Sequence, residues 1–261
     1  MADELIKVNN SEYSRYEELL LRRDEVKKEA FQLQQSYIRE FGKLILDVFE
    51  KKLECIKKKK TIEFCQRYIN QGKSVDQAAL QDYLTAELKE YEMQLQDMVK
   101  ENENAQGLGE LTEVELLQVK KIYRRLVKKI HPDINPVMDS CEKLQELWYR
   151  LTIAYECNNL KEMQETEVLI NALLKQIDIG TIEIDIPDIE DKIEKLLNEI
   201  EEIKSRDPYQ YKFLLDDTEA VKEKKQSLQD ELKEYEEYSA KLDEILGGMM
   251  LNGASFTFVM K

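Results

Sequence analysis

Residues 118–133 read QVKKIYRRLVKKIHPD, and this stretch decides the fold in the middle of the chain. Its apolar and basic residues recur with the period of an α-helix, which places them on two different faces. The apolar face comprises Val119, Ile122, Tyr123, Leu126, Val127 and Ile130, and the basic face comprises Lys120, Lys121, Arg124, Arg125, Lys128 and Lys129. Like charges at i,i+4 destabilise a helix by about a few tenths of a kcal/mol per pair. The sequence therefore predicts an amphipathic helix whose basic face has a negatively charged partner.

Signals at both ends delimit this helix. Thr112, with Glu115 three residues later, has the pattern of a capping box. Pro132 disfavours the helical conformation for the residue before it, so we expect the helix to end at His131. A second amphipathic helix is expected to begin near residues 139–140, where good N-cap residues occur. Its apolar face comprises Leu144, Leu147, Trp148, Leu151, Ala154 and Tyr155. Two antiparallel helices joined by a short loop would bury these two apolar faces together.

The composition of the whole chain favours long helices. Charged residues make up 36% of the 261 residues, and there are only 8 Gly and 4 Pro. These counts disfavour all-β, collagen-like and disulfide-rich folds, and they predict an all-α fold. Residues 11–60 and 77–104 each carry an apolar stripe at helical spacing. We expect them to form an antiparallel helical hairpin or bundle within residues 1–106.

The C-terminal third of the sequence predicts a coiled coil. Residues 189–203 and 221–246 both carry apolar residues at heptad spacing, and a break at Asp207-Pro208 separates them. Two heptad segments joined by a short breaker favour an antiparallel coiled-coil hairpin. Lys225 and Ser239 interrupt the apolar seam of the second segment.

Two short stretches alternate apolar and polar residues in the manner of β-strands. They are residues 181–186 and residues 255–259. Because a lone strand leaves its backbone groups unpaired, we expect the two to form one small two-stranded β element. The predicted domains are 1–106, a helical hairpin or bundle; 107–175, the amphipathic helix pair; and 176–261, the coiled-coil hairpin with a short strand tail.

The charge and the cysteines bound the environment and the partners. The formal net charge is −15, and residues 176–261 alone hold 22 acidic and 11 basic side chains. Such a chain is repelled by nucleic acid and by anionic membranes unless its positive charges cluster. The four cysteines lack Cys-x-x-Cys spacing and there is one histidine, so we expect free thiols, no metal site and no cofactor. No run approaches 18 apolar residues and the first residues lack a signal-peptide core, so a cytoplasmic location is expected.

The basic helix, the His131-Pro132-Asp133 tripeptide and the following helix together resemble the J domain of DnaJ-type co-chaperones. The stretch 118–133 is similar to the second helix and loop of that domain. Residues 148–155, WYRLTIAY, resemble the aromatic-x-x-Ile-x-x-Ala-Tyr pattern of its third helix. The resemblance covers about residues 116–160, and it implies that residues 107–175 form a J-like domain.

The resemblance implies a protein partner. J domains dock on the ATPase domain of a DnaK-type chaperone and stimulate its ATP hydrolysis, so the basic face would meet an acidic surface of the chaperone. The contacts implied on this helix are Lys120, Lys121, Arg124, Arg125 and Lys128. His131, Pro132 and Asp133 would form the trigger, in which Asp133 pairs with a chaperone arginine and His131 supplies a hydrogen bond. Asn135 and Tyr123 also match family positions, and Tyr123 would be partly core and partly contact.

The chain departs from the family pattern at three places. No short helix with a Tyr-x-x-Leu-Gly pattern precedes Thr112, and the loop before the third helix is longer by about three residues. Position 134 is Ile, where the family usually has a basic residue. The chain also has no Gly/Phe-rich linker and no Cys-x-x-Cys zinc region. It therefore resembles the minimal J-protein class, in which the flanking regions select a client protein or a location.

Three other functions are compatible with parts of this sequence. One is a structural coiled-coil adaptor with an inactive J-like module, and its coiled coil could also pair two copies in a homodimer. A weaker one is nucleic-acid binding through residues 57–60 and 120–129, which would show a salt-dependent affinity. Acid–base catalysis by His131 with Asp133 is disfavoured because no nucleophile or second histidine accompanies them. We therefore expect no enzyme activity.

Overall fold

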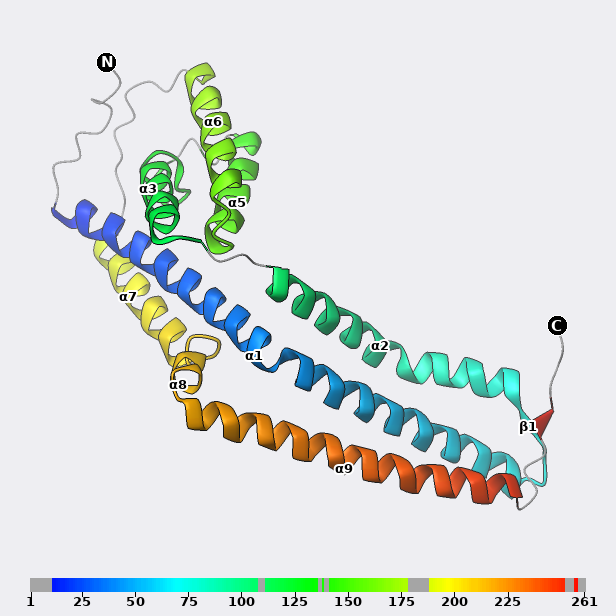
Figure 1. Ribbon diagram of the computed structural model, residues 1–261. Helices are drawn as coiled ribbons and strands as arrows, with labels where there is room; N and C mark the ends of the chain where they lie inside the picture. The colour runs from blue at the N-terminus through cyan, green and yellow to red at the C-terminus, as the bar shows by residue number, and fades with distance from the viewer. Residues whose placement is uncertain are drawn as a thin grey trace. The chain divides into compact units, whose positions relative to one another are not determined.

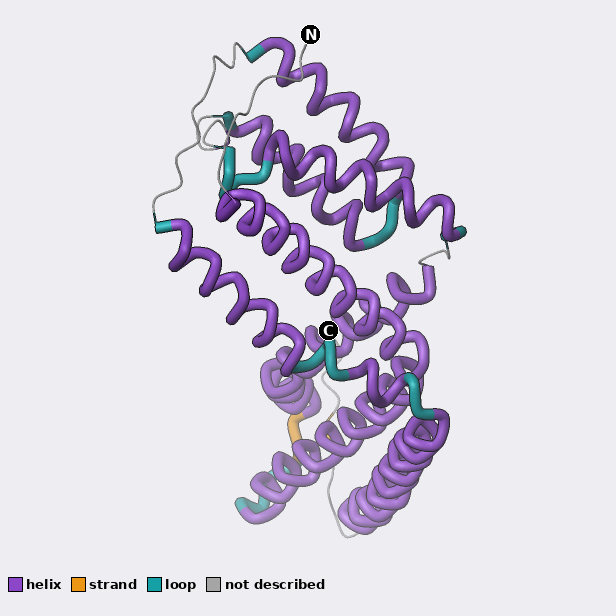
Figure 2. Tube along the Cα trace, turned by 90° about the vertical axis from the view of Figure 1, so that its left-hand side faces the viewer, coloured by secondary structure: helices purple, strands orange, loops and turns teal. Residues whose placement is uncertain are grey.

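The computed structural model describes residues 11–107, 111–135, 138, 141–177, 188–251 and 256–257. These residues form eight helices and one pair of two-residue strands, which confirms the all-α class (Figures 1 and 2). The helices are α1 (Ser11–Asn70), α2 (Gln77–Gly107), α3 (Glu113–Ile130), α5 (Glu142–Glu156), α6 (Leu160–Gln176), α7 (Ile189–Ser205), α8 (Tyr211–Leu215) and α9 (Thr218–Leu251).

The strands are β1 (Val75–Asp76) and β2 (Phe256–Thr257). They pair in parallel, with Val75 opposite Phe256 and Asp76 opposite Thr257. The strand predicted at 181–186 lies outside the described residues. The described part of the C-terminal tail is thus an extended segment as predicted, and its partner is the short stretch between α1 and α2.

The described residues form two compact units, and α1 contributes to both. Unit 1 comprises Met1–Gln35 and Leu108–Phe213, and unit 2 comprises Ser36–Gly107 and Leu214–Lys261. This division differs from the three consecutive regions predicted from the sequence. The reason is that α1 continues for 60 residues without a break, and it packs with different helices before and after residue 35.

The core of unit 1 is formed by α3, α5 and α6. Its buried residues are Val119, Ile122, Tyr123, Leu126, Val127, Ile130, Met138, Leu144, Leu151, Ala154, Tyr155, Met163 and Ile170. The apolar faces predicted for α3 and α5 meet in this core. The two helices run antiparallel, because Tyr123 lies against Tyr155 and His131 lies against Trp148. Helix α6 packs against both, and an ion pair between Arg125 and Glu167 joins it to α3.

The first part of α1 lies between this three-helix core and α7 (Figure 1). A small apolar cluster joins α1 to α7; its buried members are Tyr13, Tyr16, Leu20, Ile134, Ile193 and Leu196. Lys27 of α1 also pairs with Glu199 of α7 at 2.6 Å. Ile134 is the one member of this cluster that comes from the loop after α3, so the cluster ties that loop to both helices.

In unit 2 the rest of α1 runs antiparallel to α2. The Lys60 ammonium pairs with Glu87 at 2.6 Å, and the rings of Phe64 and Tyr83 lie 5.3 Å apart. At the other end a Cβ added to Gly42 would lie 2.5 Å from Oδ1 of Asn102. A residue without a side chain therefore allows the two helices to approach closely there. This is the helical hairpin predicted from the two apolar stripes.

Helix α9 packs along the same part of α1, and this corrects the predicted coiled-coil hairpin of 189–246. Its apolar residues are buried with Phe41 and Val48 of α1, whereas those of α7 belong to unit 1. Lys225 pairs with Glu40 at 2.5 Å, and Cys55 Sγ donates to the Tyr235 carbonyl. The nearly constant offset between these partners shows that α9 runs parallel to α1. Heptad spacing identified the buried faces, but the partner of each face is α1.

The seam between α1 and α9 contains a polar layer. Ser239 Oγ donates to Glu54 at 3.0 Å, and Lys58 Nζ donates to Ser239 Oγ at 2.7 Å and to Asp243 at 2.6 Å. These contacts explain the interruption of the heptad pattern at Ser239, because the polar side chain has partners on the facing helix. A satisfied polar group in an apolar seam specifies the register of the two helices.

Candidate functional site: the basic helix and the His-Pro-Asp loop

Helix α3 begins and ends where the sequence predicts. Thr112 Oγ1 accepts from the Glu115 backbone N–H at 3.3 Å, and Glu115 accepts from the Thr112 N–H at 2.9 Å, so the capping box is complete. At the other end the His131 N–H still donates to the Val127 carbonyl at 2.9 Å. His131 itself is extended, with φ −65° and ψ 130°, as expected for a residue before proline.

The His-Pro-Asp loop (residues 131–135) is held by its own hydrogen bonds. The Asp133 N–H donates to Nδ1 of His131 at 3.0 Å, and the Asn135 N–H donates to the His131 carbonyl at 2.9 Å. The Asn135 side-chain amide donates to the Lys129 carbonyl. Pro132 and Asp133 are exposed. The loop therefore has a defined shape, with the proline and the aspartate on its outer side.

The imidazole of His131 is buried, with 2% of the residue exposed. Its ring lies edge-on to Trp148, with 4.9 Å between the ring centroids. Burial lowers the pKa of His131, and the positive charges of Arg23 and Lys27 lower it further against the opposing effect of Asp24 and Asp133. The ring is thus a neutral, packed group that positions the loop. The hydrogen bond that the structure gives its Nδ1 atom comes from the Asp133 N–H within the loop.

Tyr123 is also buried and faces α1. Its ring stacks on Tyr155 at 3.7 Å, and its hydroxyl donates to Oδ2 of Asp24 at 2.9 Å. Burial and the Asp24 charge raise the pKa of Tyr123. On the neighbouring turn of α1, the Lys28 ammonium lies 3.9 Å from the centre of the Tyr155 ring, and burial together with Lys120 lowers the Lys28 pKa to about 8.

The first part of α1 supplies acidic partners to the basic face of α3. Lys128 pairs with Glu17 at 2.7 Å, and Arg124 pairs with Glu25 at 2.7 Å. Since residue numbers rise on one helix as they fall on the other, the two helices are antiparallel. The negative partner expected for the basic face is therefore provided, at these two positions, by the chain itself.

Arg23 of α1 reaches the His-Pro-Asp loop. Its Nη1 atom lies 3.4 Å from Oδ2 of Asp133, and its Nη2 atom lies 3.2 Å from Nε2 of His131. The same guanidinium donates to Asp24 at 3.0 Å and lies 3.8 Å from Glu199 of α7. The aspartate expected to meet an arginine of a chaperone is thus paired with an arginine of its own chain.

The structure brings half of the ten predicted site residues into contact with α1. His131, Asp133 and Tyr123 contact α1 directly, as do Arg124 and Lys128. Arg125 turns instead toward Glu167 of α6. Lys120 and Lys121 are exposed, and among the described residues neither has an ion-pair partner.

Sequence reasoning missed the residues of α1 that complete this site. They are Glu17, Arg23, Asp24, Glu25 and Lys28, and the missed anchor in the loop is Ile134. The sequence did contain one signal, charge complementarity. Asp24 and Glu25 lie seven and eight residues after Glu17, so the three carboxylates share one face of their helix. The cations of residues 120–128 likewise share one face of theirs. Apolar periodicity does not detect such a polar match.

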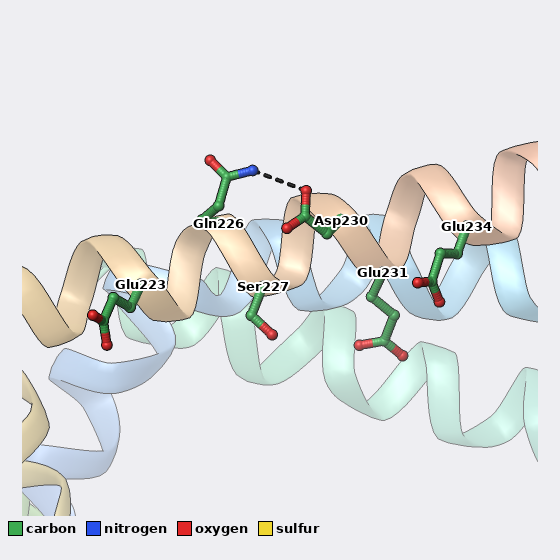
Figure 3. A pocket seen from close by; sticks show the side chains of 6 residues that line it. All are labelled: Glu223, Gln226, Ser227, Asp230, Glu231 and Glu234. Atoms are coloured by element: carbon green, nitrogen blue, oxygen red, sulfur yellow. Dashed lines mark hydrogen bonds between the residues drawn. The ribbon is translucent and has the colours of Figure 1, made fainter.

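Elsewhere the structure offers weaker candidates. A shallow groove on α9 is lined by Glu223, Gln226, Ser227, Asp230, Glu231 and Glu234 (Figure 3). Gln226 donates to Asp230 there at 2.9 Å. Of the run 57–60, Lys58 and Lys60 pair with carboxylates of α9 and α2, so this run is less available to a nucleic acid than the sequence suggested.

Among the described residues, no cluster of three or more His, Cys, Asp or Glu side chains could hold a metal ion. No described helix combines the length and the apolar character that crossing a bilayer requires. All four cysteines are free thiols.

Comparison with protein-family models, with curated proteins and with solved structures found no match to this chain.

Proposed function

We propose that the chain is a co-chaperone of the J-domain type, which docks on a DnaK-type chaperone and stimulates its ATP hydrolysis. The observation that carries the proposal is the arrangement of α3, the His-Pro-Asp loop and α5. A basic face on α3 leads directly to a loop whose proline and aspartate point outward, and an antiparallel helix supports both from behind. Such a surface suits recognition of an acidic protein surface, because cations steer association and a fixed loop gives specificity.

The internal hydrogen bonds of the loop support this proposal. Asp133 N–H to His131 Nδ1 and Asn135 N–H to the His131 carbonyl fix the backbone without help from a partner. The buried His131 holds the loop in place, and Asp133 supplies its exposed charge. A preorganised loop loses little conformational entropy when it binds, which favours affinity.

A second candidate is a structural helical adaptor whose J-like module is inactive. One observation favours it: Arg23 already contacts both Asp133 and His131, and α1 carboxylates pair with Arg124 and Lys128. An adaptor would use these contacts permanently, as part of the packing of unit 1. It predicts that partner binding is unaffected by changes at Asp133.

The two candidates separate in a single-turnover ATPase assay with a DnaK-type chaperone from the same cell, with the full chain titrated until the effect saturates. We expect the chain to raise the rate, and Asp133→Asn to raise the concentration for half-maximal stimulation about thirtyfold, since truncating one partner of a buried charge pair at an interface costs about 2 kcal/mol or more. Asp82→Asn, an exposed residue of α2, is the matched control and should leave the stimulation unchanged.

The proposal fails if neither the wild-type chain nor the variants that free the loop, described below, raise the rate at any concentration. Equal stimulation by wild type and Asp133→Asn would also contradict the assigned role of the loop. His131→Gln is a useful third variant only with a fluorescence check of Trp148, because His131 packs against that ring.

A further inference from the structure

The first part of α1 presents to α3 the kind of surface that a chaperone would present. Carboxylates of Glu17 and Glu25 pair with Lys128 and Arg124, and Asp24 accepts from Tyr123. The guanidinium of Arg23 meets Asp133. Acidic side chains together with one arginine therefore occupy two cations of the basic face and the His-Pro-Asp loop.

Ile134 fastens the loop to this segment. It is 3% exposed and is buried among Tyr16 and Leu20 of α1 and Ile193 of α7. A basic residue, usual at this position in the family that the loop resembles, could not be buried there without a large desolvation cost. The departure at position 134 is thus explained by the contact between the loop and α1.

The three-helix core does not depend on α1. All of its buried members lie within residues 119–170, and α1 contributes only the partly buried Leu21. Two of the contacts between α1 and α3 are ion pairs whose side chains on α3 are more than half exposed, and such pairs are individually weak. The third is the buried hydrogen bond from Tyr123 to Asp24, which contributes about 1.5–3 kcal/mol. None of the three belongs to the apolar core, so α1 can leave α3 without dismantling that core.

We propose that residues 11–35 of α1, hereafter the covering segment, inhibit the J-like module from within the chain, so that docking on a chaperone requires this segment to leave α3. The proposal rests on the proposed function, since it concerns regulation of the same site. In the closed state, in which the covering segment lies on α3, this segment competes with the chaperone for the same cations and the same loop. The apparent affinity for the chaperone is then reduced by the fraction of molecules that are closed.

The test is a full-chain variant that repels the covering segment, Glu17→Lys with Glu25→Lys. It places positive charges against Lys128 and Arg124 without altering either docking cation. We expect the concentration for half-maximal ATPase stimulation to fall about fivefold, because two attractive pairs become repulsive and each contributes modestly. The matched control, Glu18→Lys with Glu50→Lys, changes two exposed residues of α1 that have no ion-pair partner among the described residues. It should behave as the wild type.

A second variant addresses the loop separately. Ile134→Ser removes the apolar anchor while leaving every charge in place, and it should lower the half-maximal concentration in the same direction. Hydrogen exchange of the backbone at residues 131–135 reports opening directly and needs no chaperone. It should be faster in both variants than in the wild type and the charge control. Adding Asp133→Asn to either variant should remove the gain.

Each outcome decides between the two proposals. Faster exchange together with a lower half-maximal concentration supports both. Equal stimulation by the wild type and by the two opened variants overturns inhibition by the covering segment and leaves the co-chaperone function intact. Faster exchange with no stimulation by any variant overturns the co-chaperone function, and the inhibition falls with it. Trp148 fluorescence shows whether the Glu17→Lys, Glu25→Lys variant folds. If it does not fold, Ile134→Ser and the milder double variant Glu17→Gln with Glu25→Gln are compared with the wild type in its place.

Discussion

The hydrogen bond between Tyr123 and Asp24 joins the covering segment to α3 in a buried position, and its removal has a calculable cost. The Tyr123 hydroxyl donates to Oδ2 of Asp24 at 2.9 Å, and Tyr123 is 1% exposed. Tyr123→Phe deletes this hydroxyl and keeps the ring that stacks on Tyr155. The change therefore isolates the hydrogen bond from the packing of the ring.

The expected loss is about 1.5–3 kcal/mol, the contribution of a hydrogen bond to a charged group. Asp24 keeps its contacts with Arg23 at 3.0 and 3.1 Å through the other carboxylate oxygen, so the carboxylate is not left without a partner. This retained pairing places the expected loss toward the lower end of that range. Tyr149→Phe on α5 is the matched control, because Tyr149 is 69% exposed and should change the free energy of unfolding by less than about 0.5 kcal/mol.

Urea unfolding followed by fluorescence measures this loss within unit 1. Trp148 is the only tryptophan of the chain, and its ring lies 6.1 Å from that of Tyr123, so the signal reports the structure around the site. The midpoint should fall with little change in the denaturant dependence. A loss below about 0.5 kcal/mol would refute the assigned role of the hydrogen bond. Tyr123→Phe should also cost less in a protein that already carries Asp24→Asn. If it costs the same there as in the wild type, the two side chains act independently and the assigned hydrogen bond is refuted.

Two other predictions follow from His131 and from the glycines. Burial holds the pKa of His131 below its ordinary value of 6.5. As the pH falls, this imidazole is therefore protonated more readily in the unfolded chain than in the folded one. The free energy of unfolding should therefore decrease as the pH falls below about 6.5, and this decrease should be smaller in His131→Gln. Unfolding followed by fluorescence at pH 7.5 and at pH 5.5 measures the decrease in both proteins. Gly247→Ala should stabilise α9 by about 0.5–1 kcal/mol by helix propensity, because nothing lies within 4 Å of the added Cβ. Gly42→Ala should not show that gain, since its Cβ would lie 2.5 Å from Asn102; thermal unfolding by circular dichroism compares the two.

The helical class and the buried faces of α3 and α5 were predictable from local pattern. Residues such as Leu126 and Leu151 recur at helical spacing, and both are fully buried. Thr112 and Glu115 marked the start of α3, and Pro132 marked its end, because capping and the geometry of proline depend on neighbours in sequence. These parts of the site are encoded within about twenty residues, where sequence reasoning is strongest.

The partner of each face was not predictable in the same way. The heptad residues of α9 indicated a coiled coil, and Leu228 is indeed buried, but against Phe41 and Val48 of α1. Periodicity specifies which side of a helix is buried and carries no information about which other helix buries it. The interruptions at Lys225 and Ser239 were the better guide, since each has a polar partner on α1.

The basic face illustrates the same limit for charge. Clustered cations on α3 indicated an external anionic ligand, yet carboxylates about a hundred residues earlier in the chain meet two of them. Charge patterning predicts that compensation is needed. Whether the compensation is internal or external is decided by the fold.

The antiparallel match of carboxylates and cations between α1 and α3 has a consequence for ionic strength. If the covering segment is exchanged for an acidic chaperone surface, Lys128 and Arg124 leave one set of carboxylates and join another. Dissolved salt screens both sets to a similar degree, so its effect on the exchange largely cancels. A protein with an uncovered basic face would lose affinity steadily as salt is added. Here the balance between the two states would depend chiefly on the two contacts that water and salt do not reach, the buried Ile134 and the hydrogen bond from Tyr123 to Asp24. The response of the chain would then stay nearly constant across the ionic conditions of a cell.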